Sequence, residues 1–174
     1  ERHRRHVRGD VHLSDKAPQS ARRTPRYLDV ADHVWPATRR FMGVHTFLYR
    51  RTGGRLGHAI PGVPGKMLLL RHVGAKTGTE RTSPLLYVRD GEDLVIVASK
   101  GGYPKHPAWY HNLMANPDTT VQVRDETIPV HARVAKPEER DRLWALAVEG
   151  YKGYDDYAAR SKGREIPLVV LEPR

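Results

Sequence analysis

The sequence predicts an α+β fold in which a small antiparallel sheet closes into a barrel. Short apolar segments follow one another in hairpin order, separated by glycine and proline turns. Helix-like segments lie between and after them, which is typical of α+β proteins. Strands this short and apolar commonly close into a barrel, because closure removes exposed edges. No strand leads into a Gly-x-Gly-x-x-Gly helix start, which argues against a Rossmann dinucleotide site.

The first 25 residues differ in composition from the rest of the chain. Residues 1–26 contain eight Lys or Arg and three Asp or Glu, so 8 − 3 = +5 of the total formal charge of +10. Apolar residues are few and show no periodicity, which is typical of disorder. We therefore expect a disordered basic arm over residues 1–25 and one domain over residues 26–174, a length that suits a single compact core.

The first half of the domain is expected to contain one helix and three strands. Pro36 sits in the first turn of a helix over 36–51, in which Phe41, Val44 and Leu48 recur on one face. After a Gly- and Pro-rich loop, the segments KMLLLRHV, RTSPLLYVR and DLVIVAS read as strands over 66–73, 81–89 and 93–99. Asp90-Gly91 predicts a two-residue hairpin of type I′, which requires positive φ at both positions.

The second half adds helices and a further hairpin. A helix is expected over about 107–115, and residues 119–134 alternate apolar and polar side chains around Arg124-Asp125 as a hairpin does. Pro137 begins a helix with Glu138 and Glu139 in its first turn, where the helix dipole favours acids. A second short helix is expected over 151–160, and a last strand over 166–173.

The composition narrows the function classes. The chain has no cysteine, so it has no disulfide framework and no thiolate nucleophile, and this fits a reducing cytoplasm. No segment approaches the roughly 18–20 apolar residues of a membrane-spanning helix. A pI of about 10.1 attracts anions, which leaves nucleic acid, acidic lipid and phosphorylated small molecules as candidate partners.

The segment GAKTGTER, residues 74–81, could bind an anion. A glycine-bounded turn can present successive backbone N–H groups as an anion nest. Lys76, Thr77 and Arg81 would add two charges and a hydroxyl. The alternative is an ordinary hairpin turn with a solvated lysine, since the spacing of a P-loop is absent.

The segment SKGGYPKHPAWYHNLMANP, residues 99–117, holds more chemistry than a connection requires. Glycines after a strand let a ligand approach the backbone, which would place Ser99 and Lys100 beside it; a flexible turn is the alternative. Lys105 and His106 precede a helix start, which itself favours anions. Trp109 fits either a ligand pocket or the core, where buried tryptophans usually fill volume.

Three tyrosines recur at a spacing of three residues, at Tyr151, Tyr154 and Tyr157. On a helix they share one face, which could cover a flat ligand or pack half-buried on the sheet. The ten histidines show no metal-binding spacing such as HExxH, so no metal site is expected. No Ser/His/Asp set and no paired carboxylates can be assigned by spacing.

The order of these motifs is more specific than any one of them. GAKTG, R.SPL, RDG, VASKGG, KHPAWYHNL.ANP, EERDRLW, Y..Y..Y and IPLVVLEP follow one another along the chain. This order resembles the deazaflavin-dependent nitroreductase family of actinobacteria, from about Phe41 to Pro173. The family's proteins are split β-barrel oxidoreductases, antiparallel and flavin-reductase-like with flanking helices, which use coenzyme F420.

The resemblance also implies roles for matching positions. Residues expected to bind the cofactor are Lys76, Thr77, Arg81, Ser83, Pro84, Leu85, Ala98, Lys100, Gly101, Trp109 and Asn112. Those expected to face the acceptor, and to polarise or protonate it, are Ser99, Tyr151, Tyr154 and Tyr157. The family often has arginine where this chain has Ala75, so one contact to the anionic tail is missing or supplied elsewhere.

The implied activity is hydride transfer from reduced F420 to a flat electron-poor acceptor such as a quinone or nitroaromatic. The alternatives are a split barrel that binds a cofactor or FMN without turnover, and a basic nucleic-acid-binding module. The last is disfavoured because aromatic residues are not interleaved with Lys and Arg along the strands. The expected location is cytoplasmic, and the arm could contact an anionic membrane surface. The sequence does not fix the oligomeric state.

Overall fold

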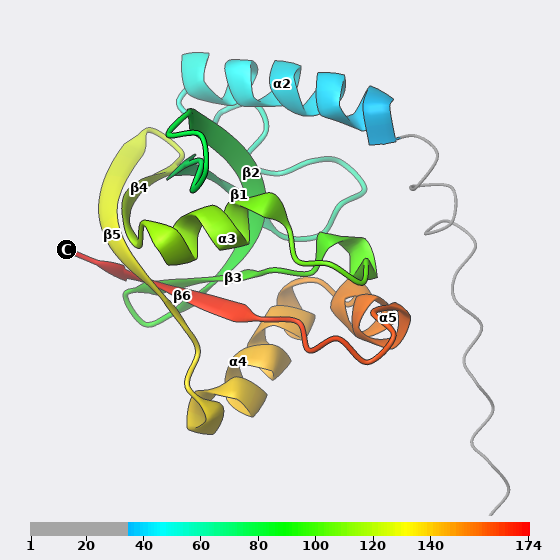
Figure 1. Cartoon of the computed structure of the whole chain (residues 1–174). Helices are drawn as coiled ribbons and strands as arrows, with labels where there is room; N and C mark the ends of the chain where they lie inside the picture. The colour runs from blue at the N-terminus through cyan, green and yellow to red at the C-terminus, as the bar shows by residue number, and fades with distance from the viewer. Residues whose placement is uncertain (1–34) are drawn as a thin grey trace, which may run out of the picture.

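The computed structural model describes residues 35–174 and the side chains of residues 42–174, so the expected basic arm lies outside the described residues. Six antiparallel strands form a closed barrel in the order β1-β2-β3-β6-β5-β4 (Figure 1). They are β1 (Lys66–Val73), β2 (Glu80–Asp90), β3 (Asp93–Val97), β4 (Asp118–Val123), β5 (Glu126–Val134) and β6 (Leu168–Pro173). The predicted antiparallel barrel with flanking helices is confirmed.

Alternate residues of each strand fill the barrel, as the period of two requires. Leu68, Leu70, Leu94, Ile96 and Leu171 are almost fully buried in one cluster. Helix α3 (Ala108–Ala115) adds two buried side chains, Trp109 and Leu113, to the same cluster. Because α3 follows directly on the loop after β3, its packing also fixes where that loop ends.

The outer face of β3 and β6 is covered by two helices. Helices α4 (Pro137–Gly150) and α5 (Gly153–Arg160) lie together on this side of the barrel in Figure 1. Leu143 and Tyr154 from these helices join Val95, Val97 and Val170 in a second buried cluster. This packing brings the tyrosine-rich helix to the sheet.

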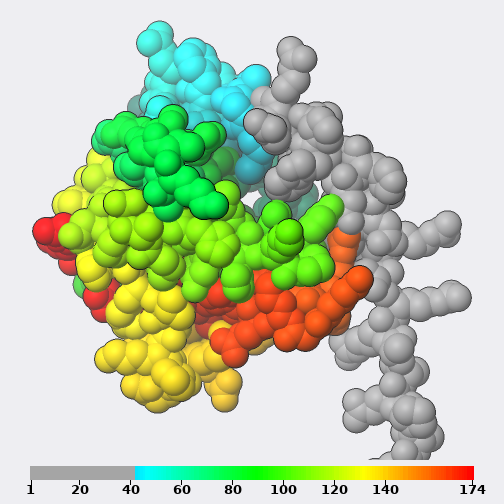
Figure 2. All heavy atoms as spheres, in the orientation of Figure 1, coloured from blue at the N-terminus to red at the C-terminus, as the bar shows by residue number. Residues whose placement is uncertain are grey.

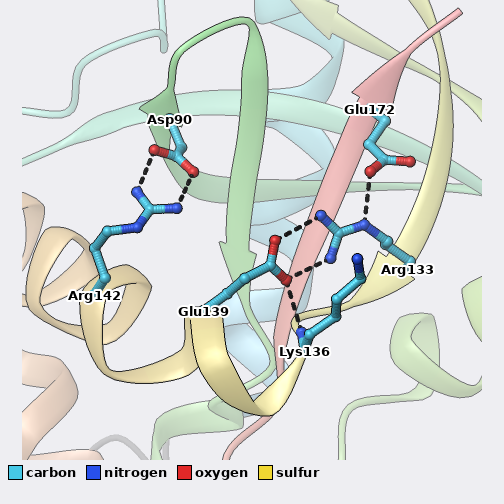
Figure 3. Close-up of polar contacts among 6 residues, drawn as sticks. All are labelled: Asp90, Arg133, Lys136, Glu139, Arg142 and Glu172. Atoms are coloured by element: carbon cyan, nitrogen blue, oxygen red, sulfur yellow. Dashed lines mark hydrogen bonds and ion pairs between the residues drawn. The ribbon is translucent and has the colours of Figure 1, made fainter.

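Two sets of ion pairs fasten the start of α4 to the barrel (Figure 3). Arg133 on β5 donates to both carboxylate oxygens of Glu139, at 2.7 and 2.9 Å, and to Glu172 on β6 at 2.6 Å. Glu139 also accepts the backbone N–H of Lys136 at 2.8 Å, and Arg142 binds both oxygens of Asp90. The hydrogen bonds from Arg133, and then that from Lys136, lower the pKa of Glu139 to about 2.

Helix α2 (Trp35–Arg51) lies across the barrel on the side away from α4 (Figure 1). Among its residues 42–51 the buried side chains are His45 and Tyr49, and the Tyr49 hydroxyl donates to the Met67 carbonyl at 3.0 Å. Val44 and Leu48 are 59% and 40% exposed. The helix was predicted correctly, but Val44 and Leu48 do not form its buried face, because α2 docks through hydrogen-bonding aromatic rings. Phe41, the third residue of the predicted stripe, lies outside the described side chains.

The two hairpin turns differ in how well their residues were predicted. Asp90 pairs with Asp93, so the loop between β2 and β3 is Gly91-Glu92, and of these only Gly91 has positive φ, at 61°. The prediction of a type I′ turn centred on Asp90-Gly91 is therefore wrong by one residue. The second turn lies at Arg124-Asp125, as expected, with Arg124 at a φ of 59°.

Candidate active site

One edge of β2 is left open by the early end of β3. Strand β2 pairs with β1 from Glu80 to Tyr87, but with β3 only from Tyr87 to Asp90. After Val97 the chain leaves the sheet and enters the short 3-10 helix η1 (Lys100–Gly102). Within the described residues, the β3-facing edge of β2 from Glu80 to Leu86 therefore has no strand beside it. Such an edge offers backbone donors and acceptors to a ligand.

The loop after β3 lies at the end of this edge in an unusual conformation. Three successive residues, Lys100, Gly101 and Gly102, have φ values of 48°, 63° and 80°. A Cβ atom at Gly102 would lie 2.6 Å from the carbonyl oxygen of Tyr157 on α5. Only glycine fits this approach, and it brings the Ser99 loop into direct contact with the tyrosine helix.

The hydroxyl of Ser99 has no hydrogen-bond partner in the part of the chain that the structure describes. Its residue is only 8% exposed, yet no described residue hydrogen-bonds to its Oγ, whereas its carbonyl accepts from Gly102 N–H at 3.0 Å. Buried hydroxyls in proteins are normally hydrogen-bonded. The Ser99 hydroxyl is therefore available to a bound molecule.

The three predicted tyrosines form one cluster but are not equivalent. Tyr154 is 6% exposed, and burial raises the pKa of its phenol well above the usual 10. The hydroxyls of Tyr151 and Tyr157 lie 3.1 Å apart and are hydrogen-bonded to each other. Tyr151 also packs edge-on against Tyr154, at 5.2 Å between ring centroids. Tyr154 is thus a core residue, whereas Tyr151 and Tyr157 are only partly buried.

A narrow cavity separates this cluster from the outer face of β2 and β3. Its volume is about 10 Å³, and it is lined by Gly65, Leu86, Val97, Gly150, Tyr151 and Tyr154, among others. That space holds about one water molecule. A flat acceptor can therefore enter here only if the tyrosines or the connection between α4 and α5 move.

The GAKTG turn does not form the backbone nest that the sequence predicts. The N–H groups of Gly74, Thr77, Gly78 and Thr79 bond within the turn, and that of Ala75 donates to the side chain of Asn112 at 3.0 Å. Of residues 74–79, only the N–H of Lys76 is left without a partner in the described part of the chain. Any anion held there must bind to side chains.

The side chain of Asn112 instead joins the turn to the barrel. Its amide nitrogen is 3.0 Å from His72 Nδ1, and His72 Nε2 is 3.0 Å from the Ser83 hydroxyl. Burial, and secondly the charge of Arg81, lowers the pKa of His72, so the ring stays neutral. Two predicted cofactor residues, Asn112 and Ser83, are thus partners of a histidine that the sequence did not single out.

The predicted cofactor residues divide between two faces of the sheet. Ala98, Trp109 and Leu85 belong to the barrel core or pack against it, which for Trp109 favours the packing role. Pro84 and Leu86 alternate with Leu85 and lie on the outer face, as the period of a strand requires. The side chains of Lys76 and Arg81 are exposed, and neither side chain makes an ion pair or hydrogen bond among the described residues.

Two features near or beyond the site were not predicted. Arg164, between α5 and β6, hydrogen-bonds the loop that carries Ser99, although no motif marks it. A larger groove of about 460 Å³ lies between residues 53–59 and the β4-β5 hairpin, lined partly by Arg55, His58 and Arg124. None of the predicted site residues lines it.

Comparisons with known proteins agree with this architecture. The family model described as F420H(2)-dependent quinone reductase matches residues 41–173. An F420H(2)-dependent quinone reductase of Mycobacterium tuberculosis (strain ATCC 25618 / H37Rv) is 47% identical over 134 residues, which cover 75% of this chain and 89% of that protein.

Two solved structures are similar along much of the chain. An F420-H2 dependent reductase, FDR-A, is 43% identical with a TM-score of 0.56, covering 61% of this chain and 93% of its own. A structure described as a domain-swapped dimer is 37% identical with a TM-score of 0.60, covering 82% and 99%. From the barrel, the order of its motifs and these matches, the chain belongs to the F420H(2)-dependent quinone reductase family of oxidoreductases.

Proposed function

We propose that this chain binds reduced F420 along the open edge of β2 and reduces a quinone beside the tyrosine cluster. Family membership supplies the reaction class, and the geometry suggests the place. The observation that carries the proposal is the hydroxyl of Ser99, a largely buried residue. This hydroxyl has no hydrogen-bond partner among the described residues, and it lies where the strand pairing ends.

The cations near this edge suit an anionic tail. F420 carries a phosphate and an oligoglutamate chain, so it needs positive side chains that are not already paired. Lys76, Arg81 and Lys105 are exposed and make no ion pair among the described residues. The bond from Ala75 to Asn112 places the Lys76 turn beside α3, while Lys105 precedes the same helix. The residues present therefore fit the cofactor.

The protein's part in the reaction is to orient the cofactor and the acceptor and to supply a proton. Bound F420H2 supplies the hydride, as cofactors carry the difficult chemistry. Ser99 can donate a hydrogen bond to an acceptor oxygen, which would stabilise negative charge as it develops. The paired hydroxyls of Tyr151 and Tyr157 can supply the proton, whereas buried Tyr154 forms a wall.

The test is anaerobic oxidation of reduced F420, followed by its visible absorbance, with quinones, nitroaromatics and enones as acceptors. We expect turnover that depends on enzyme and is fastest with quinones. Titrations with F420 and FMN accompany it. Tight FMN binding with no affinity for F420 would instead support the FMN-binding alternative.

We also propose that α2 rests on an anionic membrane surface, where lipophilic quinones partition. Val44, Phe47 and Leu48 are 59%, 62% and 40% exposed, and Arg50 and Arg51 end the helix. An exposed apolar face beside basic residues is typical of interfacial helices. Among the described residues, no helix combines the length and apolarity needed to cross a bilayer.

A further inference from the structure

Arg164 lies in the connection between α5 and β6 and reaches across to the loop after β3. Its guanidinium donates to the carbonyl oxygens of Ser99 and Tyr103, both at 2.8 Å, and to that of Ala98 at 3.4 Å. A further bond, of 2.9 Å, goes to His106 Nδ1. Figure 2 shows the green segment before α3 lying against the orange-red segment that contains α5 and leads to β6. One side chain thus contacts both ends of the loop.

These hydrogen bonds hold the chain at the point where its pairing with a neighbouring strand ends. The last sheet-like bond of this segment is from Ala98 N–H to the Pro167 carbonyl, at 2.9 Å. Beyond it, the carbonyls of Ala98 and Ser99 have no neighbouring strand within residues 35–174, and the next three residues adopt left-handed backbone angles. Lys100 is the only one of the three that is not glycine, so its conformation needs support from its surroundings.

The charge of Arg164 is not neutralised by a carboxylate. Among residues 42–174 it forms no ion pair, and it is half-buried. Arginine has only donors, so His106 Nδ1 must accept, which requires an unprotonated Nδ1 and a neutral ring. Burial first, and Arg164 second, lowers the pKa of His106 in agreement with this. The site therefore keeps a guanidinium whose partners are all neutral.

We propose that Arg164 is a positioning residue for F420 binding. It holds residues 98–106 so that the loop carrying the Ser99 hydroxyl stays at the end of the open edge of β2. The inference rests on the proposed function, because it assumes that F420 binds at that edge. Arg164 acts through the loop and is assigned no contact with the cofactor.

The experiment compares Arg164→Gln with Arg164→Lys and with Arg140→Gln in the full chain. Arg140 is the matched control, because it donates to the Ile166 carbonyl at 3.1 Å in the same connection but makes no bond to the loop. The first measurement is the rate of trypsin cleavage after Lys100 and after Lys105, read by mass spectrometry. The second is the Kd for F420.

We expect Arg164→Gln to be cut at both lysines at least about tenfold faster than the wild type and Arg140→Gln. Its Kd for F420 should rise about tenfold, a loss of the size expected for a charge-assisted hydrogen bond. Lysine should restore part of both effects, because it can still donate to the carbonyls. Added F420 should slow cleavage of the wild type.

Two results overturn the inference. One is cleavage of Arg164→Gln at the rate of Arg140→Gln; the other is faster cleavage with an unchanged Kd. If the wild type does not bind F420, the proposed function fails. The cleavage rates then decide alone whether Arg164 holds the loop, so the two failures are distinguishable.

Discussion

The hydroxyl oxygens of Tyr151 and Tyr157 lie 3.1 Å apart, with Tyr151 at the end of α4 and Tyr157 on α5. The ring of Tyr154 packs edge-on against both, with its centroid 5.2 Å from that of Tyr151 and 6.2 Å from that of Tyr157. Two hydroxyls that share a hydrogen bond can relay a proton, and the buried ring of Tyr154 supports both tyrosines in this position.

Removing a single hydroxyl of this pair should slow turnover. We expect Tyr151→Phe and Tyr157→Phe each to lower kcat about two- to tenfold, the value of one neutral hydrogen bond, with little change in the Kd for F420. Tyr154→Phe is the matched control and should retain nearly full activity. Steady-state kinetics with one quinone separates the three variants. Equal losses in all three would contradict a proton relay confined to the pair.

Ser99→Ala tests the unpartnered hydroxyl. Because no described residue bonds to Ser99 Oγ, the substitution should leave the melting temperature unchanged. We expect kcat with quinones to fall about two- to tenfold, since one donor to the acceptor is lost. Ser161→Ala is the contrast: its hydroxyl donates to the carbonyl of Ala158 or Arg164, so it should affect stability. An unchanged kcat for Ser99→Ala would exclude this contact.

Lys76→Ala should weaken F420 binding without loss of fold, because the side chain is exposed and unpaired. We expect the Kd to rise about threefold to tenfold at low salt and the difference from the wild type to shrink at high salt, where exposed charges are screened. Fluorescence titration at two ionic strengths measures both. Arg89→Ala, an exposed cation at the other end of β2, should bind as the wild type does. Equal losses in both variants would indicate a general charge effect.

Through Glu139, the stability of the folded protein should depend on pH in the acidic range. The folded pKa of about 2 lies below its usual value of 4.5, so the carboxylate stabilises the fold above about pH 4.5. This contribution is lost as the pH falls from there toward 2. Glu139→Gln should therefore melt at a lower temperature than the wild type at pH 7, and the gap should narrow between pH 5 and pH 3. The exposed neighbour Glu138→Gln, measured by calorimetry, should show no such gap.

Phe47→Asp tests the surface of α2. Phe47 is 62% exposed, so the change should leave the fold intact while opposing insertion between lipids. We expect the wild type to sediment with vesicles that contain anionic lipid, and Phe47→Asp to sediment much less. Turnover with a short-chain soluble quinone should be equal in both. Sedimentation that is equal for the two proteins would argue against α2 as the contact.

The sequence predicted the fold well because its signals are local. The order of the strands, the Arg124-Asp125 turn and the Pro137 helix start depend on neighbouring residues, and all are found. The strand ends were predicted less well: the strand expected over 93–99 ends at Val97, and the one expected over 166–173 begins at Leu168. The face of α2 was predicted wrongly because burial of His45 and Tyr49 depends on partners far along the chain, such as Gly57 and Met67. Amphipathic patterns describe hydrophobicity and cannot register such hydrogen bonds.

For the candidate site, the motifs indicated the loops and helices on which the proposal rests, but not the hydrogen bonds that their side chains make. Asn112 was predicted to touch the cofactor, yet its amide is used by Ala75 and His72. The predicted anion nest is not found for the same reason, because the N–H groups of residues 74–79 other than that of Lys76 already have partners in the turn or in Asn112. Arg164 could not have been found, since its importance follows from a loop some sixty residues earlier that only the tertiary structure brings near.

The open edge of β2 also raises the question of how the chain avoids pairing with strands of other copies. Unpaired strand edges recruit strands from other copies, and proteins commonly place proline or lysine there to prevent it. Pro84 sits in the middle of this edge and contributes no N–H to any ladder. The chain can therefore keep a stretch of sheet exposed for a ligand in a crowded cell and still resist aggregation through it.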